Sequence, residues 1–136
     1  MNNVSEKVME EDKIRYLEAI QGTINRMASN SFAIKNWFVV LFGGLLTIFF
    51  KQHEIWVPIV GIVITIFFAT QDAYYLYLER SYRNLYALAL KDEVELFDMD
   101  TTKVRTHVLY VKSFGSFSII IYFVSLLCFA ILLFIK

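Results

Sequence analysis

Two residues of opposite charge lie in otherwise apolar segments. Their charges and positions would allow them to form an ion pair. Lys35 is near the start of the apolar segment 32–50, and Asp72 is near the end of the segment 55–78. A charge inside hydrocarbon is costly unless it is paired or reaches water. We expect Lys35 and Asp72 to pair across a helical hairpin, to extend separately to the lipid headgroups, or to form a charged ring at a pore mouth.

A third apolar segment, 114–135, has no charge but carries a polar stripe. Ser118, Tyr122 and Ser125 follow one another at helical spacings of four and three residues. Such a stripe either faces another helix or lines a water-filled path. These three residues, with Lys35 and Asp72, are therefore the candidates for a pore or gate.

Small residues recur at helical spacing in the first two apolar segments. Gly61, Thr65 and Ala69 repeat every four residues, and Gly43 and Thr47 have the same spacing. Small side chains let the backbones of membrane helices approach closely. We expect these five residues to pack helices together, within one chain or between the copies of an oligomer.

Basic and aromatic side chains are interleaved in the segment 79–112, where they suit a nucleotide. Cations bind phosphate, and aromatic rings stack on bases. One copy carries a modest charge, whereas four copies around an axis would concentrate it, so a tetramer is favoured. The alternative is that the positive charge only marks the cytoplasmic side. The candidate ligand-binding residues are Arg80, Tyr82, Arg83, Tyr86, Lys91, Lys103 and Arg105.

Motifs for catalysis or metal binding are absent from the sequence. The two histidines, His53 and His107, are far apart, and no HExxH, CxxC, GxSxG, Walker loop or GxGxxG occurs. The single cysteine, Cys128, cannot form an internal disulfide. We expect a protein that is not an enzyme and has no metal or cofactor.

The composition indicates membrane helices that must position these residues. The chain has 136 residues, of which 57% are hydrophobic and 17% aromatic. So short a chain cannot bury that much apolar surface within itself. Each of the segments 32–50, 55–78 and 114–135 is about as long as the ~30 Å hydrocarbon thickness requires of a helix. The sequence predicts an all-α protein with three transmembrane spans.

Basic residues predict how these spans are oriented. Eleven of the 13 Lys and Arg residues lie before the first span, at its very start (Lys35), or between the second and third spans, and only Lys51 and Lys136 do not. Positive charge accumulates on the cytoplasmic side of membrane proteins. We therefore expect a cytoplasmic N-terminus, an outer C-terminus and a location in a bacterial inner membrane.

The two polar segments are expected to form cytoplasmic helices. Residues 1–31 form one domain and read as an amphipathic helix, packed either on segment 79–112 or on its own copies in other subunits. Residues 32–136 form the membrane domain, in which the second span continues as a helix beyond the membrane. A short helix over 103–112 leads into the third span. The amphipathic seam consists of Leu17, Ile20, Ile24, Met27, Ser31 and Ile34.

Three strings resemble a family of small bacterial membrane proteins. They are INRMASNSFAIKNW (24–37), DAYYLYLERSYRNLY (72–86) and FDMDT (97–101). The chain resembles the membrane effectors of anti-phage defence operons, among them the channel-forming effector of the Hailong system. This resemblance implies a homo-oligomeric channel that opens on infection and arrests growth. It also implies a gating nucleotide or oligonucleotide made by a partner nucleotidyltransferase.

Two other functions fit the same sequence. A holin-like or toxin-like protein would form lesions without a ligand, so reversing the charge of Arg80, Arg83 and Arg105 would leave its permeability unchanged. A non-conducting scaffold would recruit a soluble partner through residues 6–31, and their deletion would abolish that binding alone.

Overall fold

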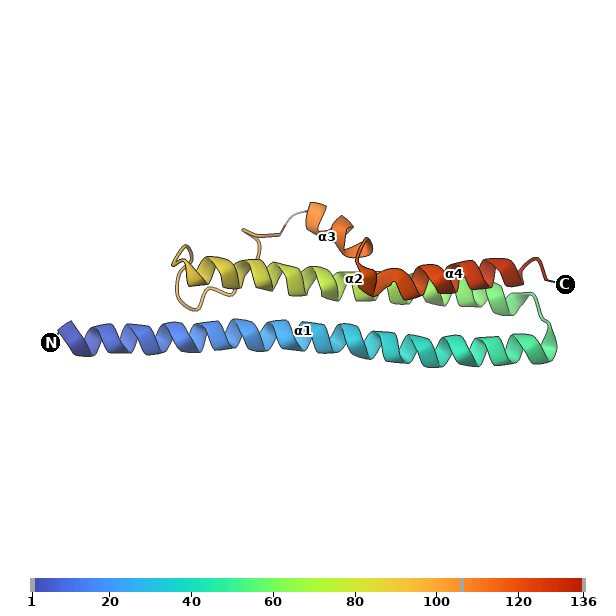
Figure 1. Cartoon of the computed structure of the whole chain (residues 1–136), viewed down its shortest axis with the longest axis horizontal. Helices are drawn as coiled ribbons and strands as arrows, with labels where there is room; N and C mark the ends of the chain where they lie inside the picture. Colours follow the sequence, from blue (N-terminus) through green and yellow to red (C-terminus); the bar gives the residue numbers. More distant parts are fainter. Residues whose placement is uncertain (1, 106, 136) are drawn as a thin grey trace.

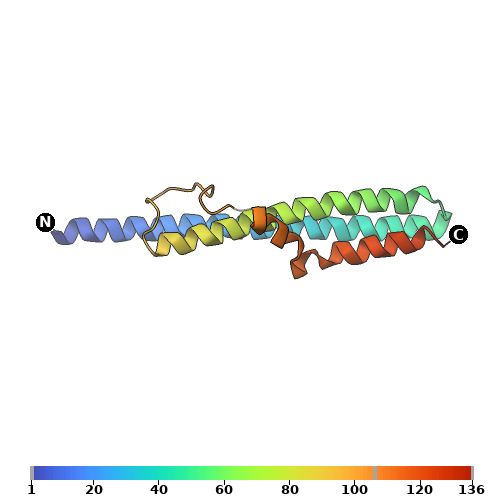
Figure 2. The same ribbon diagram turned by 90° about the horizontal axis from the view of Figure 1, so that it is seen from above.

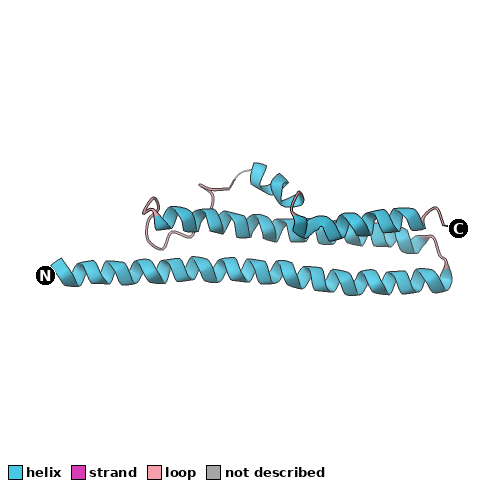
Figure 3. Ribbon diagram, viewed as in Figure 1, coloured by secondary structure: helices cyan, strands magenta, loops and turns pink. Residues whose placement is uncertain are grey.

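Helices are the only regular secondary structure over the residues that the structure describes, 2–105 and 107–135. In this computed structural model, no strand occurs in either range (Figure 3), which confirms the predicted all-α class. Two long antiparallel helices lie side by side, and the shorter elements lie along the second of them (Figure 1). The elements are α1 (Asn2–Gln52), α2 (Trp56–Leu90), α3 (His107–Phe114), the 3-10 helix η1 (Phe117–Ile119) and α4 (Ile120–Leu132).

Helix α1 is a single rod of 51 residues. The sequence predicts an amphipathic helix up to residue 31 and a membrane span from residue 32, and the structure joins the two without a break. No proline occurs in this stretch, so the intrahelical hydrogen bonds continue from the polar half into the apolar half. At 1.5 Å per residue the rod is roughly 75 Å long, more than twice the hydrocarbon thickness of a bilayer.

A tight turn connects α1 to α2. His53 has a positive φ of 51°, and its amide donates to the carbonyl of Phe49 at 2.7 Å. Pro58 lies in the first turn of α2, where a helix needs no N–H donor from it. Helix α2 then continues past Asp72 to Leu90, so the predicted extension of the second span is present as helix.

The third apolar segment does not form the continuous helix that the sequence predicts for 114–135. Helix α3 ends at Phe114, a turn follows at Gly115 and Ser116, and η1 precedes α4. The amide of Ser116 donates to the carbonyl of Ser113 at 3.2 Å, which closes the turn. Glycine and serine favour such breaks because glycine loses more entropy in a helix and serine bonds to nearby backbone.

Within the described ranges, two helices, α1 and α2, are long and apolar enough to cross a membrane. The apolar segment Phe117–Leu132 is shorter than both. Figure 2 shows α4 beside α1 and α2 at the end opposite the N-terminus, where the three helices form one bundle.

Three buried clusters hold the helices together along their length. Near the N-terminal end, α1 packs directly on the end of α2. The other two clusters lie in the apolar half and include residues of α4. The clusters are Tyr16, Ile20, Ile24, Leu85 and Ala89; Phe38, Ala73, Ile119 and Tyr122; and Phe49, Val57, Phe129 and Leu132. The first shows the amphipathic helix packed on its own chain, one of the two arrangements expected for it.

Large apolar side chains cover the outside of the bundle as well as its inside. They lie on all three helices of the apolar half, which has no layer of protein around it. A soluble monomer rarely exposes so much contiguous apolar surface, so lipid or further protein must cover it. The most exposed of them include Trp37 and Val40 on α1, Val63 and Phe67 on α2, and Phe117 and Leu127 on η1 and α4.

The first cluster predicts which part of the polar half is stabilising. We expect Ile20→Ala, at a fully buried position, to lower the free energy of unfolding by about 2–5 kcal/mol because it leaves a cavity. Ile14→Ala is the control, since Ile14 lies on the same helix but is half exposed. Chemical denaturation in mild detergent measures both. Equal stability of the two variants would show that α1 does not pack on α2 at this level.

Candidate functional site

A buried polar network joins α1 to α2 where the polar half of the bundle meets the apolar half. Lys35 Nζ lies 2.7 Å from Asp72 Oδ2 and donates to Asp72 Oδ1 at 2.8 Å. Ser31, one turn before Lys35 on α1, donates its hydroxyl to Asp72 Oδ1 and accepts from Lys35 Nζ at 2.8 Å. The structure thus contains the ion pair, the first of the three arrangements that the sequence allows.

Burial makes this network energetically important. The Asp72 side chain has no exposed surface, and that of Lys35 is 20% exposed. Removing one partner from such a pair leaves an uncompensated charge, which is strongly destabilising. The network therefore fixes the register of α1 against α2.

Tyr122 brings α4 to the same place. Its ring packs against Phe38 of α1 with a centroid separation of 4.7 Å. Its hydroxyl is buried near the Asp72 carboxylate and has no hydrogen-bond partner among the described residues. An unsatisfied buried hydroxyl costs about 1–3 kcal/mol. Asp72 thus lies where all three helices meet.

The polar stripe of the third apolar segment faces other helices in this structure. Tyr122 and Ser125 are buried, and Ser118 is half-buried. The Ser125 hydroxyl donates to the carbonyl of Ile121 at 2.8 Å. Of the two orientations that the sequence allows, these residues adopt the packed one, and Ser125 needs no water to satisfy its hydroxyl.

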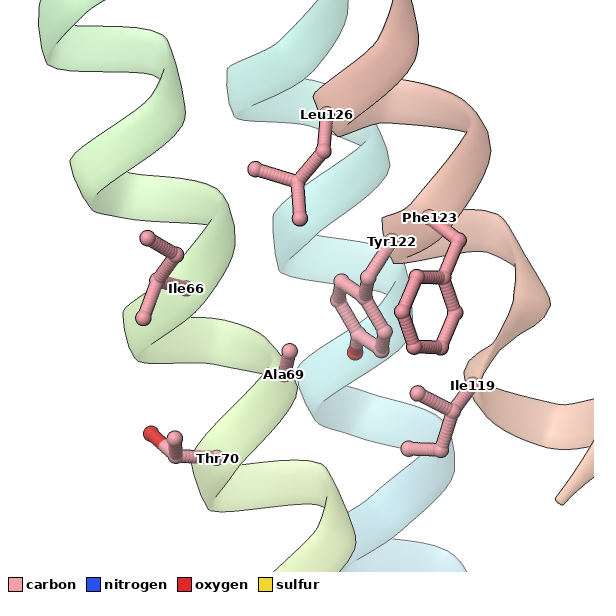
Figure 4. A pocket seen from close by; sticks show the side chains of 7 residues that line it. All are labelled: Ile66, Ala69, Thr70, Ile119, Tyr122, Phe123 and Leu126. Atoms are coloured by element: carbon pink, nitrogen blue, oxygen red, sulfur yellow. The ribbon is translucent and has the colours of Figure 1, made fainter. Parts of the chain in front are cut away.

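A small apolar cavity opens beside Tyr122, between α2 and α4 (Figure 4). Its volume is about 160 Å³, and its surface is apolar. A dry cavity of this kind suits an acyl chain or an apolar side chain rather than an ion. It is lined by Ile66, Ala69, Thr70, Ile119, Tyr122, Phe123 and Leu126.

The small residues of α2 pack as the sequence predicts. A Cβ at Gly61 would lie only 2.5 Å from the ring of Phe129, so α4 sits against the α2 backbone at this point. Thr65 is fully buried and donates to the Gly61 carbonyl at 2.7 Å. Ala69 lines the cavity described above.

The small residues of α1 behave differently. Gly43 and Thr47 are exposed, and nothing lies within 4 Å of the Cβ that Gly43 lacks. Thr47 donates to the Gly43 carbonyl at 2.9 Å. These two residues therefore do not pack helices together within one chain.

The basic residues predicted to bind a ligand are partly engaged by their own chain. Arg83 pairs with Glu79 at 2.7 Å, and Lys103 pairs with Asp98 at 3.3 Å. Arg80 is half-buried and donates to the hydroxyl of Ser113 at 3.4 Å. Ion pairs at the surface contribute little to stability, so a phosphate could compete for the exposed groups of Arg83 and Lys103.

The remaining four candidates divide into two kinds. Tyr82 and Tyr86 pack against the first buried cluster and are only partly exposed, so their rings stabilise the helix pair. Lys91 and Arg105 are exposed. A cavity at the same end of the bundle, beside the Lys13–Asp92 ion pair, contains none of the seven candidates in its lining.

Tyr16 makes contacts that the sequence pattern does not predict. Its hydroxyl donates to the carbonyl of Asp98, and its ring lies 5.8 Å from that of Phe97. Burial, and second the negative charge of Asp98, raise the pKa of the Tyr16 phenol, so the hydroxyl stays protonated and keeps donating. Tyr16 therefore ties the loop after α2 to α1. Its position beside Leu17 and Ile20 in the amphipathic seam was the available signal.

Comparisons with known proteins add no assignment. No protein-family model, curated protein or solved structure matches the chain.

Proposed function

We propose that this chain is a subunit of an oligomeric ion channel in a bacterial inner membrane, with three spans, a cytoplasmic N-terminus and an outer C-terminus. It acts as a growth-arresting effector of anti-phage defence and is gated from the cytoplasm by a nucleotide-type ligand from a partner nucleotidyltransferase. The defence role and the ligand rest on the sequence resemblance. The channel is supported by the structure of the bundle.

The main support for a channel function is the buried network of Lys35, Asp72 and Ser31. It lies where the apolar half of the bundle meets the polar half. Ionisable groups at membrane depth are expensive and usually serve ion pathways or switches. Here the network holds two helices that both continue into the polar half. A movement of the polar half would therefore act directly on this charged contact at the membrane boundary.

The gating ligand is proposed to bind the exposed cations at the cytoplasmic end. Lys91 and Arg105 are exposed, and Arg83 and Lys103 are each held by a carboxylate at the surface. Binding of a polyanion there would shift a closed–open equilibrium if it favoured one state. Tyr82 and Tyr86 transmit the shift, because they pack on the cluster that joins α1 to α2.

Ion flux from proteoliposomes tests both parts of this proposal. We expect the purified protein to conduct, and a short single-stranded DNA or a cyclic dinucleotide added outside inside-out vesicles to change the flux. Arg105→Glu should weaken the nucleotide effect. The matched control is Lys51→Glu, since Lys51 is exposed in the last turn of α1 at the far end of the bundle.

Two results would contradict the proposal. No flux under any nucleotide condition, and no depolarisation of cells that express the protein, would exclude a channel. Flux that none of the nucleotides changes, with Arg105→Glu like the wild type, would instead support the ligand-independent lesion former.

A further inference from the structure

The outward face of α1 carries a pattern that the packing of a single chain does not use. Residues on this face recur every seven positions in two adjacent rows, four residues apart, and all of them are exposed. More than half are small, namely glycine, alanine, serine or threonine. We call this face the α1 seam. Its rows are Arg15, Gly22, Ser29, Asn36 and Gly43, and Ala19, Arg26, Ala33, Val40 and Thr47.

A seven-residue repeat is the spacing at which two helices stay in contact over many turns. It keeps one face toward a partner as the helices supercoil. The seam extends from residue 15 to residue 47 of an unbroken helix. The face of α1 that packs on α2 lies opposite, with Ile20, Ile24 and Phe38, so one helix offers two separate contact surfaces.

Charged side chains at the polar end of the seam are available to a second copy. Arg15 has Glu11 four residues before it and Glu18 three residues after it, and all three side chains are exposed. None of them has an ion-pair partner within the described part of the chain. Parallel copies at the same register would place Arg15 opposite Arg15 of the other copy, and Glu11 and Glu18, which flank both, supply the carboxylates that offset this repulsion.

Asn36 is a second polar residue on the seam, at the membrane boundary, that is free to bond to another copy. It is exposed one residue after Lys35, and no hydrogen bond to its side-chain amide is found among the described residues. An amide in hydrocarbon needs a partner, and hydrogen bonds between asparagines hold membrane helices together. A single asparagine in such a row also fixes the register of the paired helices.

The other lipid-facing surfaces of the bundle lack these features. Helix α2 exposes large side chains such as Val63 and Phe67, and α4 exposes Phe123 and Leu127. Bulky side chains suit acyl chains, whereas a row of small residues leaves backbone that another helix can approach closely. The seam is thus distinguished from α2 and α4 by side-chain size as well as by charge.

We propose that the α1 seam is the interface with a second copy of this chain, parallel to the first. This proposal rests on the proposed oligomeric channel and names its contact surface. In the oligomer the α1 helices lie next to one another and surround the axis, while α2 and α4 face the lipid. Within the apolar half of the bundle, the polar groups nearest the axis are then Asn36 and Thr47, and the buried Ser125 is not among them.

Disulfide cross-linking in isolated membranes tests the interface. In a Cys128→Ser background, we expect Gly22→Cys, Asn36→Cys and Gly43→Cys to form covalent dimers under mild oxidation, because a disulfide needs Cα atoms within about 7 Å. Val63→Cys on α2 and Leu127→Cys on α4 are the controls, since each of those side chains is 63% exposed. They should give several-fold less dimer.

A second variant shows that the cross-link depends on helix packing and not on how readily each cysteine oxidises. Gly43→Leu should abolish the Asn36→Cys cross-link, while the helix content measured by circular dichroism remains unchanged. The interface is overturned if Val63→Cys dimerises as strongly as Gly43→Cys, or if no seam position cross-links. Conduction without seam cross-links would refute the interface and leave the channel standing. Seam cross-links without conduction would support the interface and refute the channel.

Discussion

Lys35→Met is expected to lower the free energy of unfolding by about 3–5 kcal/mol, as removal of one partner of a buried ion pair does elsewhere. The variant leaves Asp72 with no exposed surface and without its cation, which lies 2.7 Å away in the wild type. Only the Ser31 hydroxyl would still donate to the carboxylate. Titration of the purified protein from mild detergent into a denaturing one measures the change.

The double variant Lys35→Met/Asp72→Asn separates loss of the pair from loss of a contact. An amide keeps the shape of Asp72 and carries no charge, so we expect it to recover most of the stability lost in the single variant. Lys51→Met is the matched control, because Lys51 is exposed. If Lys35→Met were as stable as Lys51→Met, the Lys35–Asp72 contact would not hold the helices together.

Gly61→Ala is expected to destabilise the bundle by about 1–3 kcal/mol, the usual cost of overpacking. The added methyl group would lie 2.5 to 2.7 Å from three ring atoms of Phe129, so α4 must shift away from α2. By helix propensity alone, alanine would be favoured over glycine by about 1 kcal/mol. A loss of stability would therefore report the contact between α2 and α4. The melting temperature in detergent, followed by circular dichroism, is the measurement.

Gly44→Ala provides the opposite expectation on the neighbouring helix. Nothing lies within 4 Å of a Cβ at Gly44, so this change should leave the melting temperature unchanged or raise it. Phe129→Leu, combined with Gly61→Ala, should restore part of the loss by making room for the methyl group. A melting temperature of Gly61→Ala at or above that of the wild type would show that α4 does not contact α2 at Gly61.

The parts of the fold that the sequence predicts are those with strong local causes. The absence of proline and glycine after Asp72 carries α2 to Leu90. The amphipathic pattern through Ile20 and Ile24 places the inner face of α1 on the end of α2. The cost of a buried charge predicts that Lys35 can meet Asp72, but not that Ser31 completes the network, because hydroxyl partners follow from side-chain geometry.

The parts that the sequence does not predict are those where positions with similar local sequence pack differently in the fold. The segment 114–135 carries no charge and is long enough for a span, so its hydropathy does not separate the break at Gly115 and Ser116 from the helix that follows. Spacing alone cannot tell that Ser125 bonds within its own helix rather than lining a path. Gly43 and Gly61 have similar surroundings in sequence, yet only Gly61 touches a neighbouring helix within the chain.

The ion pair also constrains how the chain enters the membrane during synthesis. Lys35 and Asp72 are 37 residues apart and belong to one hairpin that is complete before Phe117 is translated. Inserted singly, each helix would present an unpaired charge near the membrane boundary to the insertion machinery, at a cost below the about 2.5–3.5 kcal/mol of a charge at the helix centre. Inserted as a hairpin, α1 and α2 neutralise each other. The nascent chain is therefore expected to be released into lipid as a helix pair, with α4 docking afterwards.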